Sequence, residues 1–292
     1  MIYFLLLIIS AVGTSGNFSL TKVYQKTVGT AIRESIVLNM YVGLFGAVVF
    51  LIINGFHIEF TPYSCLIALL LSLLIGTYTI IGFKIMSMGS MTVYTIFVML
   101  GGAVVPYVYG ILFLDERVNL AKIIALLLIT VSVILNCVEK TPGKQSVKFL
   151  LLCIAVFFIN GSTSILSKLH QIETEYRVVS TDSFVFLKNG MRFLLFSLLL
   201  PFCGRKTKEH RKIPKAMYFV MLCSAIVSSF ANMLQLIGAS NLPATMLYPV
   251  VTGGTVICTS LFDRLCFGQH LYKRTIISII ICTIALLLFL VK

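Results

Sequence analysis

Long apolar stretches, separated by short polar gaps, recur along the whole chain of 292 residues. As an α-helix, about 20 apolar residues at a rise of about 1.5 Å per residue cross a hydrocarbon core of roughly 30 Å. With 59% hydrophobic and only 11% charged residues, the chain lacks the polar surface that a water-soluble domain of this size needs. The sequence therefore predicts a polytopic, all-α membrane protein.

A window of about 19 residues divides the chain into ten apolar segments joined by short connections. The first segment has no Lys or Arg before it, which argues against a cleaved signal peptide. We therefore expect ten transmembrane helices, at residues 2–24, 36–54, 64–83, 91–114, 119–138, 148–168, 183–203, 216–237, 243–262 and 274–291.

Two stretches far apart in the chain resemble each other. "SLTKVYQ" begins at Ser19 in the first segment, and "ILSKLHQ" begins at Ile165 in the sixth. A glycine pair at 101–102 in the fourth segment likewise matches a pair at 253–254 in the ninth. Glycine pairs allow helix backbones to approach closely in lipid. These matches indicate that the chain consists of two copies of a five-helix unit.

An odd number of helices per copy determines how the second copy lies in the membrane. After five crossings the chain enters from the opposite side, so the two copies are inverted relative to each other. Inverted repeats are a common plan of transporters, with the substrate site near the midplane where the halves meet. The expected fold is thus an all-α membrane protein of ten transmembrane helices in two inverted five-helix repeats, residues 1–140 and 147–292.

The sequence lacks motifs for several other kinds of function. It contains no spaced acid pair, Ser-His arrangement, H-E-x-x-H or nucleotide-binding loop. The eight cysteines are scattered without a C-x-x-C and are typical of small buried apolar residues. The basic residues lie mainly in short gaps, as the positive-inside rule describes, and not in a patch for nucleic acid. We expect no enzymatic activity, no cofactor, no metal and no nucleic-acid partner.

Three stretches carry a resemblance to a known family. "GTSGNFSLTK" lies at the end of the first helix, and "SMTVYTIFVMLGGAVVPYVYGILFLDER" and "LPATMLYPVVTGGTVICTSLFDRLCFGQH" occupy equivalent places in the two halves. Together they resemble the EamA-type transporters of the drug/metabolite transporter superfamily. In that family the fourth helix runs into a G-E-like turn, here "LDER", whereas Gln269 replaces the usual acid in the second half. The resemblance implies a ten-helix carrier that works by alternating access.

The charged residues inside the apolar segments are basic. All ten Asp and Glu lie in gaps or at predicted helix ends, which disfavours a cation/proton antiporter with a mid-membrane carboxylate. Lys22 and Lys168 occupy matching repeat positions at the ends of polar stripes, and Lys188 and Arg192 lie four residues apart on one helix face. If these four face the interior, the site prefers anionic or zwitterionic solutes. The alternative is that they extend to the membrane interface.

Neutral polar residues complete the candidate substrate site. Asn17, Tyr94, Asn232 and Tyr248 lie in the first, fourth, eighth and ninth segments and are able to face a common path. Hydrogen bonding between helices explains such residues equally well. Both interpretations stay open at this point.

These observations favour a secondary transporter, an exporter of a small amino-acid-like or anionic metabolite, in the plasma membrane. The alternative is a flippase or carrier for a lipid-linked or phosphorylated group, which basic residues would also suit. The expected partners are a small-molecule substrate and the lipid bilayer, with homodimer formation left open.

The distribution of basic residues predicts the topology. The gaps after the odd-numbered segments hold sixteen Lys and Arg, whereas the other gaps and the C-terminus hold five. The positive-inside rule then places both termini outside, although relatives are usually assigned cytoplasmic termini. A single Cys at Lys208, in the loop with six basic residues, should resist an impermeant thiol reagent in intact cells and react after permeabilisation. Labelling of intact cells would place this loop outside and contradict the assignment.

Overall fold

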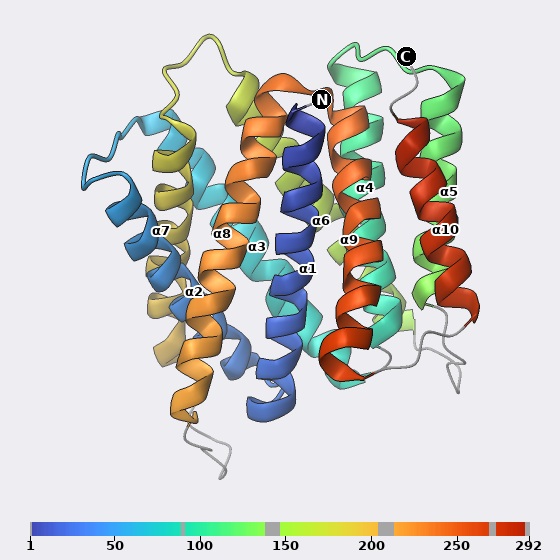
Figure 1. The fold of residues 1–292 in the computed structure, drawn as a ribbon. Coiled ribbons are helices and arrows are strands. Elements are labelled where there is room, and N and C mark those ends of the chain that lie inside the picture. The colour runs from blue at the N-terminus through green and yellow to red at the C-terminus, as the bar shows by residue number, and fades with distance from the viewer. Residues whose placement is uncertain (1, 89–90, 138–146, 204–212, 269–272, 290–292) are drawn as a thin grey trace.

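A computed structural model describes residues 2–88, 91–137, 147–203, 213–268 and 273–289 of the chain (Figure 1). These ranges form ten α-helices and one 3-10 helix, and they contain no strand. The helices are α1 (Ile2–Val28), α2 (Ile32–Ile53), α3 (Pro62–Met88), α4 (Met91–Phe113), α5 (Leu120–Cys137), α6 (Val147–Ile172), α7 (Thr181–Leu199), α8 (Lys215–Asn241), α9 (Ala244–Phe267) and α10 (Lys273–Leu288), with the 3-10 helix η1 at Leu200–Phe202.

Each predicted segment coincides with a helix, but several helices extend further. Helices α1, α3, α6 and α8 continue for about one turn beyond the predicted ends, because a hydropathy window follows only the apolar part of a helix. Eight helices are long and apolar enough to cross a membrane. The other two are shorter: the apolar part of α5 is described from Leu120 to Leu135, and α10 has 16 residues. Ten helices are therefore found where ten spans were expected, and eight of them have the length and composition of a membrane span.

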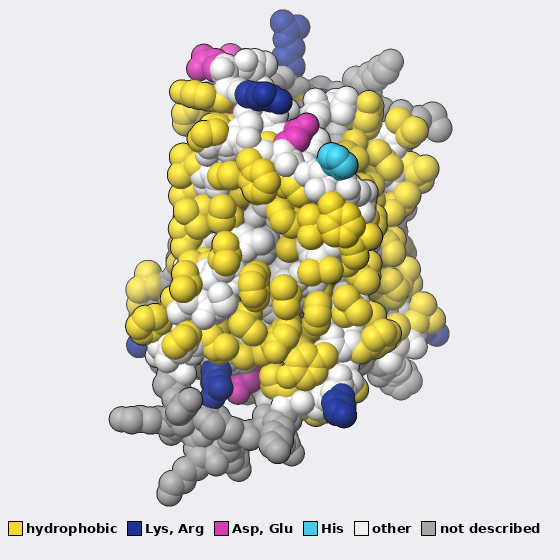
Figure 2. Space-filling view, turned by 90° about the vertical axis from the view of Figure 1, so that its left-hand side faces the viewer, with side chains coloured by type: hydrophobic (Ala, Val, Ile, Leu, Met, Phe, Trp, Pro, Cys, Tyr) yellow, Lys and Arg dark blue, Asp and Glu magenta, His cyan; other side chains and the backbone are white. Residues whose placement is uncertain are grey.

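The helices run alternately up and down the bundle. Figure 1 shows the two termini at one end of the bundle and the last turns of α1, α3, α5, α7 and α9 at the other. The basic loop at 204–212, which contains Lys208, lies outside the described residues. Figure 2 shows that the side of the bundle is mainly hydrophobic and that its charged side chains gather toward the two ends. This surface matches a membrane protein whose sides contact lipid and whose ends contact water.

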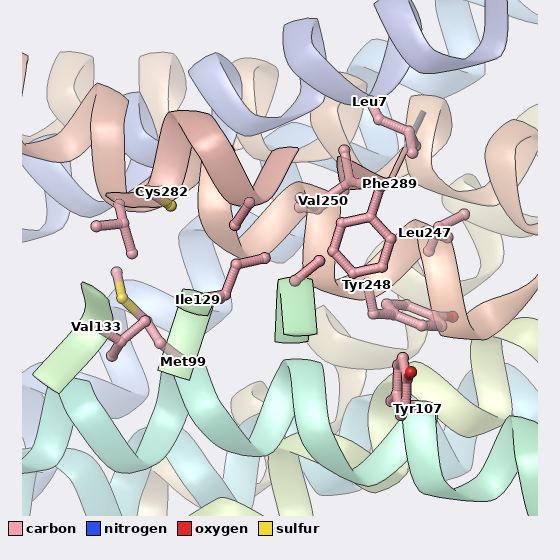
Figure 3. Packing of buried hydrophobic residues seen from close by; sticks show 14 of the residues in the cluster. Leu7, Met99, Tyr107, Ile129, Val133, Leu247, Tyr248, Val250, Cys282 and Phe289 are labelled. Atoms are coloured by element: carbon pink, nitrogen blue, oxygen red, sulfur yellow. The ribbon is translucent and has the colours of Figure 1, made fainter. Parts of the chain in front are cut away.

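The largest buried hydrophobic cluster joins α1, α4, α5, α8, α9 and α10 (Figure 3). It includes Ile129 and Val133 of α5, Leu247 and Tyr248 of α9, and Phe289. Helix α9 is the most buried of the eight candidate spans. The ninth segment of the sequence is therefore the central helix of the part of the bundle that surrounds this cluster.

The glycine pairs lie where helices cross closely. A Cβ added to Gly101 of α4 would lie 2.2 Å from the Phe157 carbonyl oxygen of α6, and one added to Gly254 of α9 would lie 2.7 Å from the Ala11 Cβ of α1. Both distances are far below van der Waals contact. The first pair thus permits the α4–α6 contact and the second permits the α1–α9 contact. Gly190 of α7, in contrast, has open space around its Cβ position.

These contacts predict that Gly101→Ala will destabilise the protein by about 1–3 kcal/mol, because the methyl group collides with a backbone carbonyl that cannot rotate away. Gly190→Ala is the matched control and should leave stability unchanged or raise it, since alanine favours helix. Thermal unfolding in detergent measures both. Equal midpoints for the Gly101 variant and the parent would contradict the close crossing.

Candidate functional site

Helix α7 places two cations on one face inside the bundle. Lys188 and Arg192 are four residues apart, about one turn, so their side chains leave the helix on the same side. The helix packs against α2, α3 and α8. Lys188 is only 8% exposed although it is charged. Its burial excludes the alternative that this lysine extends to the membrane interface.

Amide oxygens from two neighbouring helices bind these cations. The Lys188 ammonium donates a hydrogen bond to Oδ1 of Asn232 on α8. The Arg192 guanidinium donates from Nε (3.0 Å) and Nη2 (2.5 Å) to Oδ1 of Asn39 on α2. The side chain of Tyr78 on α3 lies near the same guanidinium. We call Lys188, Arg192, Asn39, Asn232 and Tyr78 the cationic cluster.

The cationic cluster holds positive charge without a carboxylate. The hydrogen bonds that the described residues give to Lys188 and Arg192 run to amide oxygens and not to a carboxylate. The two cations also repel each other. Neutral amide oxygens compensate a buried charge only in part. The cluster therefore has the chemistry of a site for an anion.

Lys22 makes a different contact from its expected repeat partner Lys168. Its ammonium lies 2.8 Å from Oδ1 of Asp263 near the end of α9, and the two side chains are 20% and 26% exposed. This salt bridge joins α1 to α9 at the end of the bundle opposite the termini. Lys22 thus contacts a protein carboxylate, and its predicted role toward substrate stays a prediction.

Lys168 is buried at the other end and binds backbone. Its ammonium donates to the carbonyl oxygens of Ala239 (2.6 Å) and Leu242 (2.8 Å), at the last turn of α8. It is 6% exposed, so its side chain is covered by the protein and not by solvent. A cation at this position satisfies carbonyls that a helix end leaves without partners.

The neutral candidates are distributed over several contacts. Asn17 on α1 accepts a hydrogen bond from the Ser224 hydroxyl of α8 (2.6 Å). The Tyr248 hydroxyl on α9 donates to the Ser164 carbonyl oxygen of α6 (2.5 Å). Of these candidates only Asn232 joins the cationic cluster. The side chain of Tyr94 lies outside the part that the structure describes.

Three contributing residues were not predicted as site residues. Asn39 was visible as a polar residue inside an apolar segment, and Tyr78 had no distinguishing signal. Glu116 lies in the "LDER" turn, and its carboxylate accepts hydrogen bonds from the backbone N–H groups of Ala244 (2.6 Å) and Thr245 (2.8 Å). These two residues begin α9, so Glu116 acts as a cap for a helix far along the chain. The described residues contain no group of three or more His, Cys, Asp or Glu that could hold a metal ion.

Comparisons with known proteins address the family and the fold. Residues 147–291 match the model of the EamA-like transporter family, which confirms the resemblance found in the sequence. No curated protein matches the chain. A crystal structure described only as that of a protein aligns with a TM-score of 0.74, over 96% of this chain and 95% of its own, at 11% identity. At this identity the likeness shows a shared fold alone.

The Lys22–Asp263 contact gives a test of the role of Lys22. If the lysine serves the salt bridge, Lys22→Ala, Asp263→Ala and the double variant should lose similar stability, about 1 kcal/mol for a partly exposed pair. Detergent unfolding of the four proteins measures the coupling. If transport is lost only in the lysine variants while all four have equal stability, Lys22 acts on substrate instead.

Proposed function

We propose that the protein, whose residues 147–291 match the EamA-like transporter family, is a secondary transporter for small anionic or zwitterionic solutes. It works by alternating access between two inverted five-helix repeats, residues 1–140 and 147–292. The proposed direction is export across the plasma membrane, as the resemblance implies.

A reciprocal contact between α5 and α10 supports the inverted repeats. The Ser132 hydroxyl donates to the Ser278 carbonyl oxygen (2.8 Å), and the Ser278 hydroxyl donates to the Ser132 carbonyl oxygen (2.8 Å). Each residue thus makes the same bond to the other, as a two-fold axis between the helices requires. Both serines are fully buried. They are 146 residues apart, close to the spacing of the repeats.

The pairing of helices supports the same symmetry. Exchanging every helix with the one five places along the chain turns the contact of α1 with α8 into that of α6 with α3, and the contact of α1 with α9 into that of α6 with α4. The pairs α2–α7, α4–α9 and α5–α10 map onto themselves. Two contacts, α5–α9 and α6–α8, have no counterpart of similar extent. The two halves therefore share one pattern of helix contacts, apart from these two contacts.

The charge of the cationic cluster carries the proposal on substrate. Lys188 and Arg192 attract an anion, and the guanidinium fork is suited to bidentate binding of a carboxylate or phosphate. The donors come from α7, whereas Asn39 and Asn232 come from α2 and α8. The cluster thus spans both proposed repeats, and the midplane between repeats is where such transporters bind substrate. A cationic solute would meet uncompensated repulsion there.

The alternative substrate, a lipid-linked or phosphorylated group, shares the negative charge. A lipid-linked group needs a lateral path for its chain, whereas a soluble phosphorylated solute does not. The transport measurement described below therefore includes both kinds of substrate. The observation that favours a small solute is the burial of Lys188 inside the bundle.

We predict that Arg192→Gln lowers uptake of anionic substrate into protein-containing liposomes by roughly tenfold or more, because a partly buried charge contact is lost. The panel contains amino acids, dicarboxylates, sugar phosphates, a neutral sugar, an organic cation and a fluorescent phospholipid. Lys215→Gln removes an exposed cation and is the matched control. Equal loss for the neutral sugar and the anions would indicate a folding defect, and transport of the cation alone would overturn the proposal.

A further inference from the structure

Charged side chains hold the turn between α8 and α9 from two directions. Lys168 donates to Ala239 and Leu242 at the end of α8. Glu116 accepts from the N–H groups of Ala244 and Thr245 at the start of α9. A cation thus lies at a helix C-terminus and an anion at a helix N-terminus, the arrangement that both helix dipoles favour. The two charges also attract each other.

Helix α9 depends on Glu116 because it has no cap of its own. Its N-cap residue is Pro243, whose side chain forms no capping hydrogen bond. The N–H groups of Met246 and Leu247 bond to the Pro243 carbonyl oxygen (3.1 and 3.0 Å). The two preceding N–H groups of the helix bond to the two carboxylate oxygens of Glu116, one each. One side chain therefore completes the start of α9.

The Glu116 contact crosses from one half of the chain to the other. Glu116 follows α4 in the first half, whereas Lys168, α8 and α9 belong to the second. Gly110 leaves the space that this crossing needs, since an added Cβ would lie 2.7 Å from Oε2 of Glu116 and 3.2 Å from Cγ2 of Thr245. At the opposite end, Lys22 of the first half binds Asp263 of α9. The first half thus holds the central helix at both of its ends.

The first residues of α9, which follow the turn, are shielded from solvent. Ala244, Thr245 and Leu247 are at most 1% exposed, and Tyr248 is 5% exposed. Ala239 lies seven residues beyond Asn232 on α8, so the turn is roughly 10 Å along the helix from the cationic cluster. The turn thus lies between the level of the cationic cluster and the end of the bundle where the two termini lie.

We propose that Glu116 and Lys168 are positioning residues that close the transport path at the end of the bundle where the two termini lie. Lys168 orders the α8–α9 turn, and Glu116 fastens it to the first half. A contact made in only one conformation stabilises that conformation, so its loss shifts the population toward the open one. The consequence for transport rests on the proposed function, but the closure can be measured without substrate.

Thr245→Cys in an otherwise cysteine-free protein reports closure. The Thr245 side-chain oxygen has no hydrogen-bond partner in the described part of the chain, so the replacement loses no such bond. Membrane fragments expose both faces to an impermeant maleimide. We expect Glu116→Gln to raise the labelling rate about fivefold or more, because it removes the charge and one of the two acceptors. Lys168→Met should raise it less, since its bonds lie within one half.

Gly110→Ala tests the contact with every charge retained. The new methyl group displaces the Glu116 carboxylate, so labelling should rise as it does in Glu116→Gln. Asp115→Asn is the matched control, because Asp115 is exposed and makes no hydrogen bond or ion pair among the described residues. Asp263→Asn loosens the opposite end and should not raise labelling at position 245. A rise with Asp115→Asn equal to that with Glu116→Gln would overturn the proposal.

Restoring Cys282 in the cysteine-free protein distinguishes opening of the path from unfolding of the protein. It is fully buried between α10 and α9, and it should stay unlabelled in every variant that keeps the fold. Unchanged labelling at position 245 in Glu116→Gln and Gly110→Ala would refute the closure, as would equal labelling of both cysteines. If the labelling confirms closure but the protein transports no anion into liposomes, the proposed substrate class is wrong. The role of Glu116 in closing the path is then still supported.

Discussion

Hydrocarbon offers no hydrogen bonds, so a polar group between the two ends of the bundle is stabilised only by a partner inside the protein. Helices meet this demand for the backbone, and many hydroxyl groups meet it by bonding to the carbonyl four residues earlier, as Ser15, Ser72 and Thr255 do. The difficult groups are those that a single helix cannot satisfy. These are the helix ends and the charged side chains, and their partners determine how the helices pack.

The same constraint distinguishes the basic residues from one another. Lys22 has a carboxylate partner, and Lys168 has two carbonyl oxygens together with the attraction of the Glu116 carboxylate. Lys188 and Arg192 have amide oxygens, which carry only part of a charge. Two of the four cations are therefore compensated by contacts that serve packing, and two retain attraction for a further negative group. This difference is the reason that we propose the cationic cluster as the site for substrate.

Helix α9 is where the packing and the proposed transport cycle meet. It is the most buried candidate span, it crosses α1 closely at Gly254, and Pro249 lies within it. Proline removes one backbone hydrogen bond and favours bending at that point. The first half of the chain holds both ends of α9, and Pro249 removes a hydrogen bond between them. We therefore expect that one end of α9 can move while the other stays in place.

The sequence by itself determined the membrane-spanning helices, because any run of about 20 apolar residues must satisfy its backbone locally in lipid. It also determined that Lys188 and Arg192 share a face and that the glycine pairs mark close crossings, since both follow from helical geometry and residue size. The sequence did not identify which residues far apart in the chain contact each other. Lys22 and Lys168 match in the repeat, yet one binds Asp263 and the other the end of α8. Glu116 looked like a loop residue, and only the tertiary structure placed it at the start of α9, because which helix ends meet depends on packing that no local pattern encodes.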